Sequence, residues 1–320
     1  MNSSINEDSA TSQNITCDPV ERSNHPLPLF FYILVFLVGL ILNSFTLWFY
    51  CCGAHRQVSK SLTIYLKHLT AADFLLCISL PMRIIYYSTR SFTVHLFYCS
   101  FGSVVIYLNM ITSILFMGYI AANRYMKIFY SSETSFLMTT KASHIISMTT
   151  WFVSLTLMTS YSIILLITHK PHPYLSTCEL LLSDHVNSLR LVMQCFASFV
   201  FMLVLLSLVF FYYNTCRRVR QIQQRQMGSN SKRLLKSRRN MLVLVSVFCF
   251  CFVPFHLIRL PYILFGGHCS EVFYYLKEVT LLMSVCNICL DPLIYLFFCK
   301  DFKSHLKEMF CMKGKKNTST

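Results

Sequence analysis

The sequence predicts an all-α membrane protein, a bundle of seven transmembrane helices with a short amphipathic helix after the last span. Of its 320 residues, 55% are hydrophobic and only 13% are charged, and its mean hydropathy is +0.52. A water-soluble domain of this length needs more polar residues to cover its surface. The apolar runs are continuous rather than alternating with polar residues, which argues against a β-barrel.

Seven windows of ~20 or more mostly apolar residues are long enough to cross a bilayer. They cover residues 29–52, 62–88, 98–128, 142–168, 189–216, 240–265 and 273–298. The chain thus divides into an N-terminal segment (1–28), a membrane bundle (29–298) and a C-terminal tail (299–320). In the tail, apolar residues recur at three- and four-residue steps, which predicts an amphipathic helix on the inner leaflet: Phe302, Leu306, Met309 and Phe310.

The positions of Lys and Arg predict the orientation of the chain in the membrane. Basic residues crowd the loop between the fifth and sixth windows and the tail. Because cytoplasmic loops carry such an excess, we expect an extracellular N-terminus and a cytoplasmic C-terminus at the plasma membrane. The polar first 25 residues argue against a cleavable signal peptide, and sequons predict glycosylation of Asn2 and Asn14. The net charge of +15 lies on membrane-bounded loops, so we expect no nucleic-acid partner.

Four of the 15 cysteines fall on the predicted outer side, where disulfides can form: Cys17, Cys99, Cys178 and Cys269. They allow three pairings, of which we favour Cys99–Cys178 together with Cys17–Cys269. Cys299 and Cys311 lie near the inner leaflet and are candidates for palmitoylation.

A set of polar residues inside the windows predicts an acidic site. Carboxylates inside a membrane span are costly and functional by default. Asp73 lies in the second window, and the third and seventh windows offer oxygen-bearing side chains at helical spacing: Asn109, Ser113, Ser284, Asn287 and Asp291. If these faces meet, the two carboxylates share a proton or hold a cation, for which sodium suits the all-oxygen set. The alternative is a structural hydrogen-bond hub.

Cations gather near the outer ends of the windows and predict a site for an extracellular anion. Arg83, Arg259 and Lys277 would repel one another unless an anion lies between them, and Arg suits phosphate oxygens. Glu278, next to Lys277, supports the alternative that some of these cations are paired internally. Aromatic side chains such as Tyr107 and Phe255 fit a base or an acyl chain equally well, so nucleotides and lysophospholipids both remain open.

The sixth window contains a candidate for the moving part of the bundle. Pro254 cannot donate its backbone N–H, so we expect the helix to bend there. One turn further on, His256 and Arg259 share a helix face. A bent helix with a polar pair just beyond its bend is predicted to act as a ligand-triggered lever.

Together, these motifs resemble those of the rhodopsin-like (class A) G-protein-coupled receptors over nearly the whole chain. The matching residues are Asn43, Leu69–Asp73, Cys99 with Cys178, Asn123-Arg124-Tyr125, Trp151, Cys251–Pro254 and Asp291–Tyr295. The resemblance implies a receptor that is not an enzyme and needs no cofactor, with a heterotrimeric G protein and arrestin as partners. It also implies activation roles for a set of residues near the inner side: Asn123, Arg124, Tyr125, Phe252, Pro254, Pro292 and Tyr295.

A closer resemblance is to the purinergic ADP and UDP-sugar receptors and their orphan neighbours, carried by Tyr107, Phe255–Pro261 and Lys277–Leu281. It implies inhibitory G proteins and a nucleotide or nucleotide-sugar ligand, with phosphate at His256, Arg259 and Lys277. The expected ligand site is Arg83, Tyr107, Phe255, His256, Arg259, Lys277 and Glu278.

Three alternatives to a nucleotide receptor remain. The first is a receptor for a lysophospholipid or another lipid mediator, and the second is a constitutively active receptor without a diffusible ligand. The third is a membrane transporter, which the 8 glycines and the lack of an internal repeat argue against. One departure from the family pattern bears on activity. Asn123 stands where an Asp is usual, which removes a charge restraint on Arg124 and predicts raised basal signalling.

Overall fold

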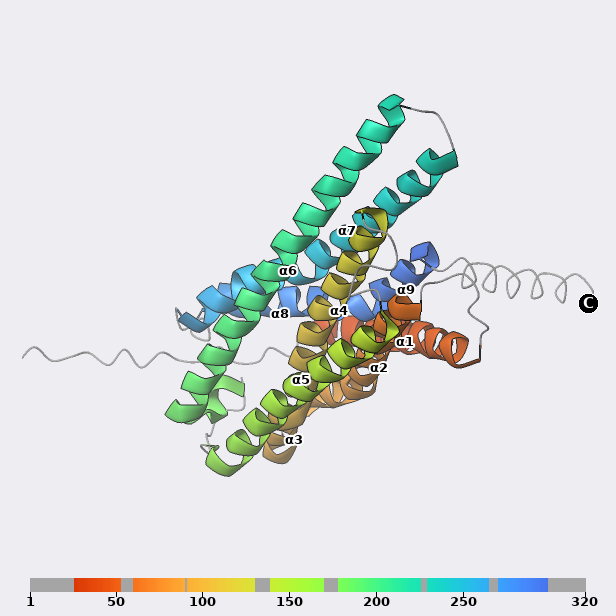
Figure 1. The fold of residues 1–320 in the computed structure, drawn as a ribbon. Coiled ribbons are helices and arrows are strands. Elements are labelled where there is room, and N and C mark those ends of the chain that lie inside the picture. The colour runs from red at the N-terminus through yellow and green to blue at the C-terminus, as the bar shows by residue number, and fades with distance from the viewer. Residues whose placement is uncertain are drawn as a thin grey trace, which may run out of the picture.

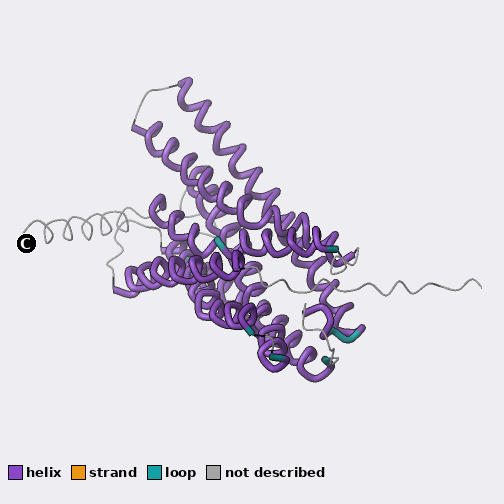
Figure 2. Tube along the Cα trace, turned by 180° about the vertical axis from the view of Figure 1, so that it is seen from behind, coloured by secondary structure: helices purple, strands orange, loops and turns teal. Residues whose placement is uncertain are grey.

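The computed structural model describes residues 26–52, 60–89, 91–129, 139–169, 178–225, 229–264 and 270–298. These residues form α1 (Pro26–Cys52), α2 (Lys60–Ser88), α3 (Phe92–Phe97), the π-helical turn η1 (Tyr98–Gly102), α4 (Ser103–Phe129) and α5 (Thr140–Thr168). They continue with the short 3-10 helix η3 (Cys178–Leu181), α6 (Asp184–Arg225), α7 (Ser229–Leu264), α8 (Glu271–Val285) and α9 (Asn287–Phe298). Helices joined by short connections make up this part of the chain (Figure 2).

Seven helical stretches in the described residues are long and apolar enough to cross a membrane. Five of them lie in the single helices α1, α2, α5, α6 and α7. The third span joins α3, η1 and α4, and the seventh joins α8 and α9. The predicted all-α bundle of seven spans is therefore confirmed. The predicted amphipathic helix in 299–320, the N-terminal sequons and the candidate palmitoylation cysteines lie outside the described residues.

Two helices extend well beyond the windows predicted from hydropathy. The fifth and sixth windows end at residue 216 and begin at residue 240, whereas α6 continues to Arg225 and α7 begins at Ser229. Hydropathy falls where the basic residues begin, but Arg, Lys and Gln are good helix formers, so the helices continue outside the apolar region. The connected ends of α6 and α7 project beyond the rest of the bundle (Figure 1).

The seventh span departs from regular α-helix at one residue, Cys286, whose backbone N–H still donates to the Leu282 carbonyl at 3.0 Å. Helix α8 ends at Val285 and α9 begins at Asn287. Pro292, inside α9, has no N–H to give to the carbonyl of Ile288, four residues earlier. The Asn43 side-chain amide of α1 donates to that carbonyl at 2.7 Å, so a neighbouring helix supplies the missing bond.

The core lies along α4, which packs against α2, α5, α6 and α7. Phe116, Met117, Ile120 and Ala121 of this helix are fully buried. In contrast, many large apolar side chains of α6 point outward, as expected for a surface that faces lipid rather than water. Helix α1 approaches α9 closely, since a Cβ added at Gly39 would lie 2.7 Å from the Ile288 Cδ1 atom.

One disulfide ties the third span to the segment before α6. Cys99 in η1 is bonded to Cys178 in η3, which confirms this predicted pairing. The partner cysteines of the second predicted disulfide, Cys17 and Cys269, lie outside the described residues. The end of the bundle that carries Cys99–Cys178 is called the disulfide end below, and the opposite end, where α6 and α7 carry basic residues, is called the basic end.

Candidate functional site

A cavity of about 460 Å³ opens at the disulfide end, a volume typical of small-molecule sites. Its walls come from α2, α4, α5, α6, α7 and α8, with η1 and the disulfide along one side. All seven residues of the predicted ligand site line it: Arg83, Tyr107, Phe255, His256, Arg259, Lys277 and Glu278. The tertiary structure thus brings together residues from four different helices.

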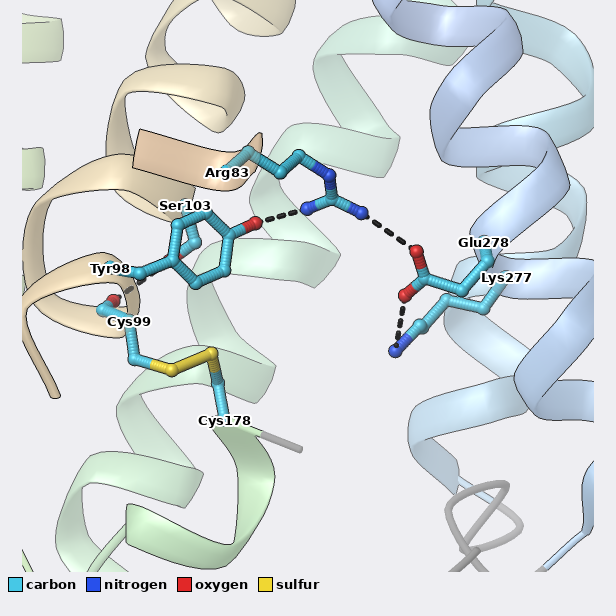
Figure 3. The surroundings of a disulfide bond; sticks show 7 residues. All are labelled: Arg83, Tyr98, Cys99, Ser103, Cys178, Lys277 and Glu278. Atoms are coloured by element: carbon cyan, nitrogen blue, oxygen red, sulfur yellow. Dashed lines mark hydrogen bonds and ion pairs between the residues drawn. A yellow bond between two sulfur atoms is a disulfide. The ribbon is translucent and has the colours of Figure 1, made fainter. Parts of the chain in front are cut away.

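Arg83 of α2 is held firmly by the protein itself. Its side chain reaches between Tyr98 and Glu278 (Figure 3), forms an ion pair with Glu278 at 2.7 Å and donates to the hydroxyls of Tyr98 and Tyr87. The guanidinium carbon also lies 4.5 Å from the centre of the Tyr32 ring. Since Arg83 is only 3% exposed and has these partners, it stabilises the outer ends of the helices more than it offers a free charge to a ligand.

Glu278 of α8 also contacts a second cation, Lys277 of the same helix. Its ion pair with Arg83 joins α8 to α2. The Lys277 ammonium lies 3.1 Å from the Glu278 Oε1 atom, while the other oxygen binds Arg83, as Figure 3 shows. Tyr87 donates a further hydrogen bond to this carboxylate. The alternative of internal pairing therefore holds for Arg83 and in part for Lys277.

Arg259 of α7, a further cation of the cavity wall, lies against aromatic rings. The guanidinium carbon of Arg259 lies 5.5 Å from the Tyr107 ring centre and 5.4 Å from that of Tyr262. Such cation–π contacts stabilise a cation without neutralising it. Among the lining residues that the structure describes, four side chains are Arg or Lys and one is a carboxylate: Arg83, Arg190, Arg259, Lys277 and Glu278. The described wall is therefore positively charged.

The imidazole ring of His256 lies in the cavity wall, and the described residues form no hydrogen bond with either of its nitrogens. Its ring stacks on Phe201 with a centroid distance of 4.2 Å and an interplanar angle of 8°. It is 7% exposed and lines the cavity, and neither ring nitrogen has a hydrogen-bond partner among the described residues. A buried polar group without a partner is costly, so a ligand in the cavity is a natural partner for it.

The cavity also has an apolar arm that was not predicted from the sequence. We define the apolar arm by Ile111 of α4, Leu157 of α5 and four residues of α6: Val192, Met193, Phe196 and Ala197. These residues look like ordinary lipid-facing side chains in a hydropathy pattern. The signal available in the sequence was the spacing of the α6 residues, which places them on one helix face.

The predicted acidic site is assembled near the middle of the bundle. The Asn109 amide donates to Asp73 at 3.2 Å, and the Asn287 amide lies 3.2 Å from both the Asn109 and Ser113 oxygens. Ser284, near the end of α8, is also buried. Asp73 and Asp291 are fully buried, and one oxygen of Asp73 and both of Asp291 have no hydrogen-bond partner within the described ranges. Buried carboxylate oxygens of this kind fit a shared proton or a monovalent cation.

At the basic end, the Asn123 side chain joins α4 to a neighbouring helix. Its amide donates to the Ser61 hydroxyl of α2 at 3.0 Å, and it is only 1% exposed. Arg124 is half-buried, and Tyr125 stacks on Phe211 of α6 with a centroid distance of 4.7 Å. Asn123 therefore links α4 to α2 through a neutral hydrogen bond.

The remaining residues of the predicted activation set lie on α7 and α9, between the cavity and the basic end. Thr70 donates to the Tyr295 hydroxyl at 2.9 Å, which joins α2 to α9. Phe252 is fully buried against Phe248 on α7, and the prolines 254 and 292 lie inside α7 and α9. These residues therefore connect the cavity with the basic end through α7 and α9.

The sequence matches the family model of the 7 transmembrane receptor (rhodopsin family) over residues 42–295. It is 31% identical to purinoceptor 14 of Bos taurus, over 88% of this chain and 83% of the relative. It is 30% identical to G-protein coupled receptor 171 of Homo sapiens, over 94% of each chain, and 29% identical to purinoceptor 13 of Homo sapiens, over 90% of this chain and 82% of the relative. With seven membrane-spanning helices and this match, the chain belongs to the rhodopsin-like family of G-protein-coupled receptors, in the branch of the purinoceptor-like receptors.

Proposed function

We propose that this plasma-membrane receptor is activated by an extracellular anionic small molecule whose phosphate lies among His256, Arg259 and Lys277. The observation that carries the proposal is the pairing of a positive wall with a buried His256 whose ring nitrogens lack partners among the described residues. Phosphate oxygens accept charge-assisted hydrogen bonds from all three side chains when the histidine is protonated or donates from one nitrogen.

Two classes of ligand bear such a phosphate. A nucleotide or nucleotide sugar is supported by relatives named purinoceptors and by Tyr107 and Phe255, whose rings lie 6.2 Å apart and offer a surface for a base. A lysophospholipid is supported by the apolar arm, which continues the cavity away from the cations. Both classes are negatively charged, so the anion site itself does not distinguish them.

The ion pair of Lys277 with Glu278 can couple ligand binding to a movement of the helices. An incoming phosphate competes with the Glu278 carboxylate for the Lys277 ammonium and adds an anion beside Arg259 of α7. Ligand therefore draws α7 toward α8 at the disulfide end, and Pro254 is the point at which the inner half of α7 can swing. A ligand acts only through its higher affinity for the open bundle.

In this proposal the disulfide end faces the outside of the cell and the basic end faces the cytoplasm, as the excess of Lys and Arg supports. The N-terminus is then extracellular, with glycans at Asn2 and Asn14. The open basic end receives a heterotrimeric G protein of the inhibitory class and, after activation, arrestin. The acidic site around Asp73 and Asp291 holds sodium in the inactive bundle, which the uncompensated carboxylate oxygens support. No nucleic acid is a partner.

The test is a cyclic AMP or calcium assay in cells expressing the full chain, with nucleotides, nucleotide sugars and lysophospholipids as probes. Arg259→Ala and Lys277→Ala should each lower the potency of the active probe by about tenfold or more, because each removes a charge-assisted hydrogen bond. Arg259→Lys should recover part of the loss, since it keeps the charge without the forked geometry. Lys141→Ala, an exposed lysine at the basic end, serves as the control. A response that survives both alanine substitutions would move the anion site elsewhere.

A further inference from the structure

The apolar arm extends from the cationic region toward the membrane-facing side of the bundle. Helix α4 packs against both α5 and α6, and residues of these three helices line the arm. On α6, Leu189, Val192, Met193, Phe196 and Ala197 recur at three- and four-residue steps and all line the cavity. Such spacing places them on one face of the helix, which is turned toward α4 and α5.

Several residues of the arm belong to the cavity wall and to the outer surface of the bundle at once. Val192 is 64% exposed, Phe196 51% and Leu157 41%, although all three line the cavity. In a buried site these side chains would be covered by neighbouring helices. Their exposure means that, between α5 and α6, little protein separates the cavity from the surrounding lipid.

Most cations of the cavity come from other helices than the apolar arm: Arg83, Arg259 and Lys277 lie on α2, α7 and α8, whereas α4, α5 and α6 build the arm. Arg190 lines the cavity one turn closer to the disulfide end than Met193, and its guanidinium donates to the Asn187 side chain at 2.8 Å. From Arg190 to Ala197 the helix rises by ~10 Å at 1.5 Å per residue. The wall is thus mainly cationic on the side of α2, α7 and α8 and mainly apolar on the side of α4, α5 and α6, where Gln194 is a polar exception. An anionic single-chain lipid likewise carries its charge at one end and an apolar chain at the other.

From this geometry we infer that the ligand is an anionic single-chain lipid, whose phosphate binds the cations and whose acyl chain lies in the apolar arm and enters from the bilayer between α5 and α6. The inference rests on the proposed anion site and specifies the rest of the ligand. A ribose or a second sugar in the arm would lose most of its hydrogen bonds to water, because the six side chains of the arm carry no hydrogen-bonding group and Gln194 is the one polar α6 residue that lines the cavity between Arg190 and Ala197. An acyl chain gains from the same surroundings.

The first experiment compares probes that differ only in the chain. Membranes with the full-length receptor and a G protein are exposed to lysophospholipids bearing an oleoyl chain on glycerol phosphate, phosphoserine or phosphoinositol. The best headgroup is then tested with shorter chains and without a chain, beside ADP and UDP-glucose. We expect potency to fall by about tenfold for every two methylenes removed. Potency that does not depend on chain length would overturn the inference.

The second experiment fills the arm. Ala197→Trp in α6 and Leu157→Trp in α5 should lower the potency of the oleoyl lipid by about tenfold or more, because an indole ring occupies the space of the chain. The matched controls are Cys195→Trp and Ile163→Trp, on the same two helices. Both controls lie at exposed positions that do not line the cavity, so we expect parental potency. An equal loss in the controls would contradict a chain in the arm.

A third measurement does not depend on the folding of any variant. The purified parent receptor is irradiated with the oleoyl lipid carrying a photoreactive diazirine at the chain end, and the labelled peptides are identified. Labelling of α5 and α6 is expected, while labelling confined to other helices would overturn the inference.

The outcomes also separate this inference from the proposed anion site. Activation by nucleotides alone, lost in Arg259→Ala and Lys277→Ala, would keep the anion site and reject the lipid. Activation by the lipid that is unchanged in both variants would reject the anion site. Loss of the lipid response in these variants and in Ala197→Trp, with the controls unchanged, would support both.

Discussion

Replacing the carboxylate of Glu278 by an amide tests how the cations of the cavity are neutralised. In the parent, this carboxylate lies 2.7 Å from an Arg83 nitrogen and 3.1 Å from the Lys277 ammonium. Glu278→Gln keeps the size of the side chain but removes the negative charge. The amide oxygen can still accept from one of the two cations, but the NH2 group then faces the other cation, which is itself only a donor. Arg83 and Lys277, 3% and 8% exposed, then lose their shared anion.

The magnitude follows from these distances. With an effective dielectric constant of about 20, Coulomb attraction at 2.7 and 3.1 Å amounts to about 6 and 5 kcal/mol, most of which is offset by the cost of burying the charges. Removing one partner of a buried ion pair generally costs about 3–5 kcal/mol. At about 2–4 °C per kcal/mol, we expect the Tm of the ligand-free receptor to fall by about 6 °C or more.

The assay is thermal unfolding of the purified receptor, followed with a dye that reacts with cysteines. Cys77 and Cys251 are buried and free, so they report unfolding. Pyrophosphate should raise the Tm of Glu278→Gln more than that of the parent, because an external anion then takes the place of the carboxylate. Glu271→Gln, an exposed carboxylate at the start of the same helix, is the matched control. A parental Tm in Glu278→Gln, or an equal loss in the control, would refute the reasoning.

Three further predictions concern the rest of the bundle. Asn123→Asp should lower ligand-free signalling in a G-protein activation assay, since a carboxylate beside Arg124 stabilises the closed bundle; equal or higher output would count against it. Asp291→Asn should weaken the effect of sodium, relative to choline, on ligand-free signalling, because it removes the negative charge and one of the two buried oxygens of this carboxylate; an unchanged sodium effect would exclude this cation site. Gly39→Ala should lower the Tm by an amount equivalent to about 1–3 kcal/mol, since its Cβ would lie 2.7 Å from the buried Ile288. Gly118→Ala, whose Cβ would come no closer than 3.1 Å to Val204, should cost less.

The spans and the polar residues inside them could be predicted from the sequence because the bilayer imposes both. Hydrocarbon requires about 20 apolar residues per helix and makes every buried carboxylate and cation costly. Asp73, Asp291, Arg259 and Lys277 are therefore conspicuous in the sequence alone. The donation of the Asn43 amide to the Ile288 carbonyl, which Pro292 leaves without a backbone partner, could not be predicted in the same way, because it depends on how α1 and α9 pack against each other.

The sequence by itself thus determined the class of the protein, the number of its spans and the types of polar residue within them. Only the tertiary structure decided which of these residues meet. It paired Glu278 with both Arg83 and Lys277, turned Asn123 toward Ser61 and joined ordinary lipid-facing residues of α4, α5 and α6 into the apolar arm. The physical reason is that hydropathy depends on each helix alone. Pairing between helices depends on the rotation and depth of each helix relative to its neighbours, which packing of the whole bundle sets.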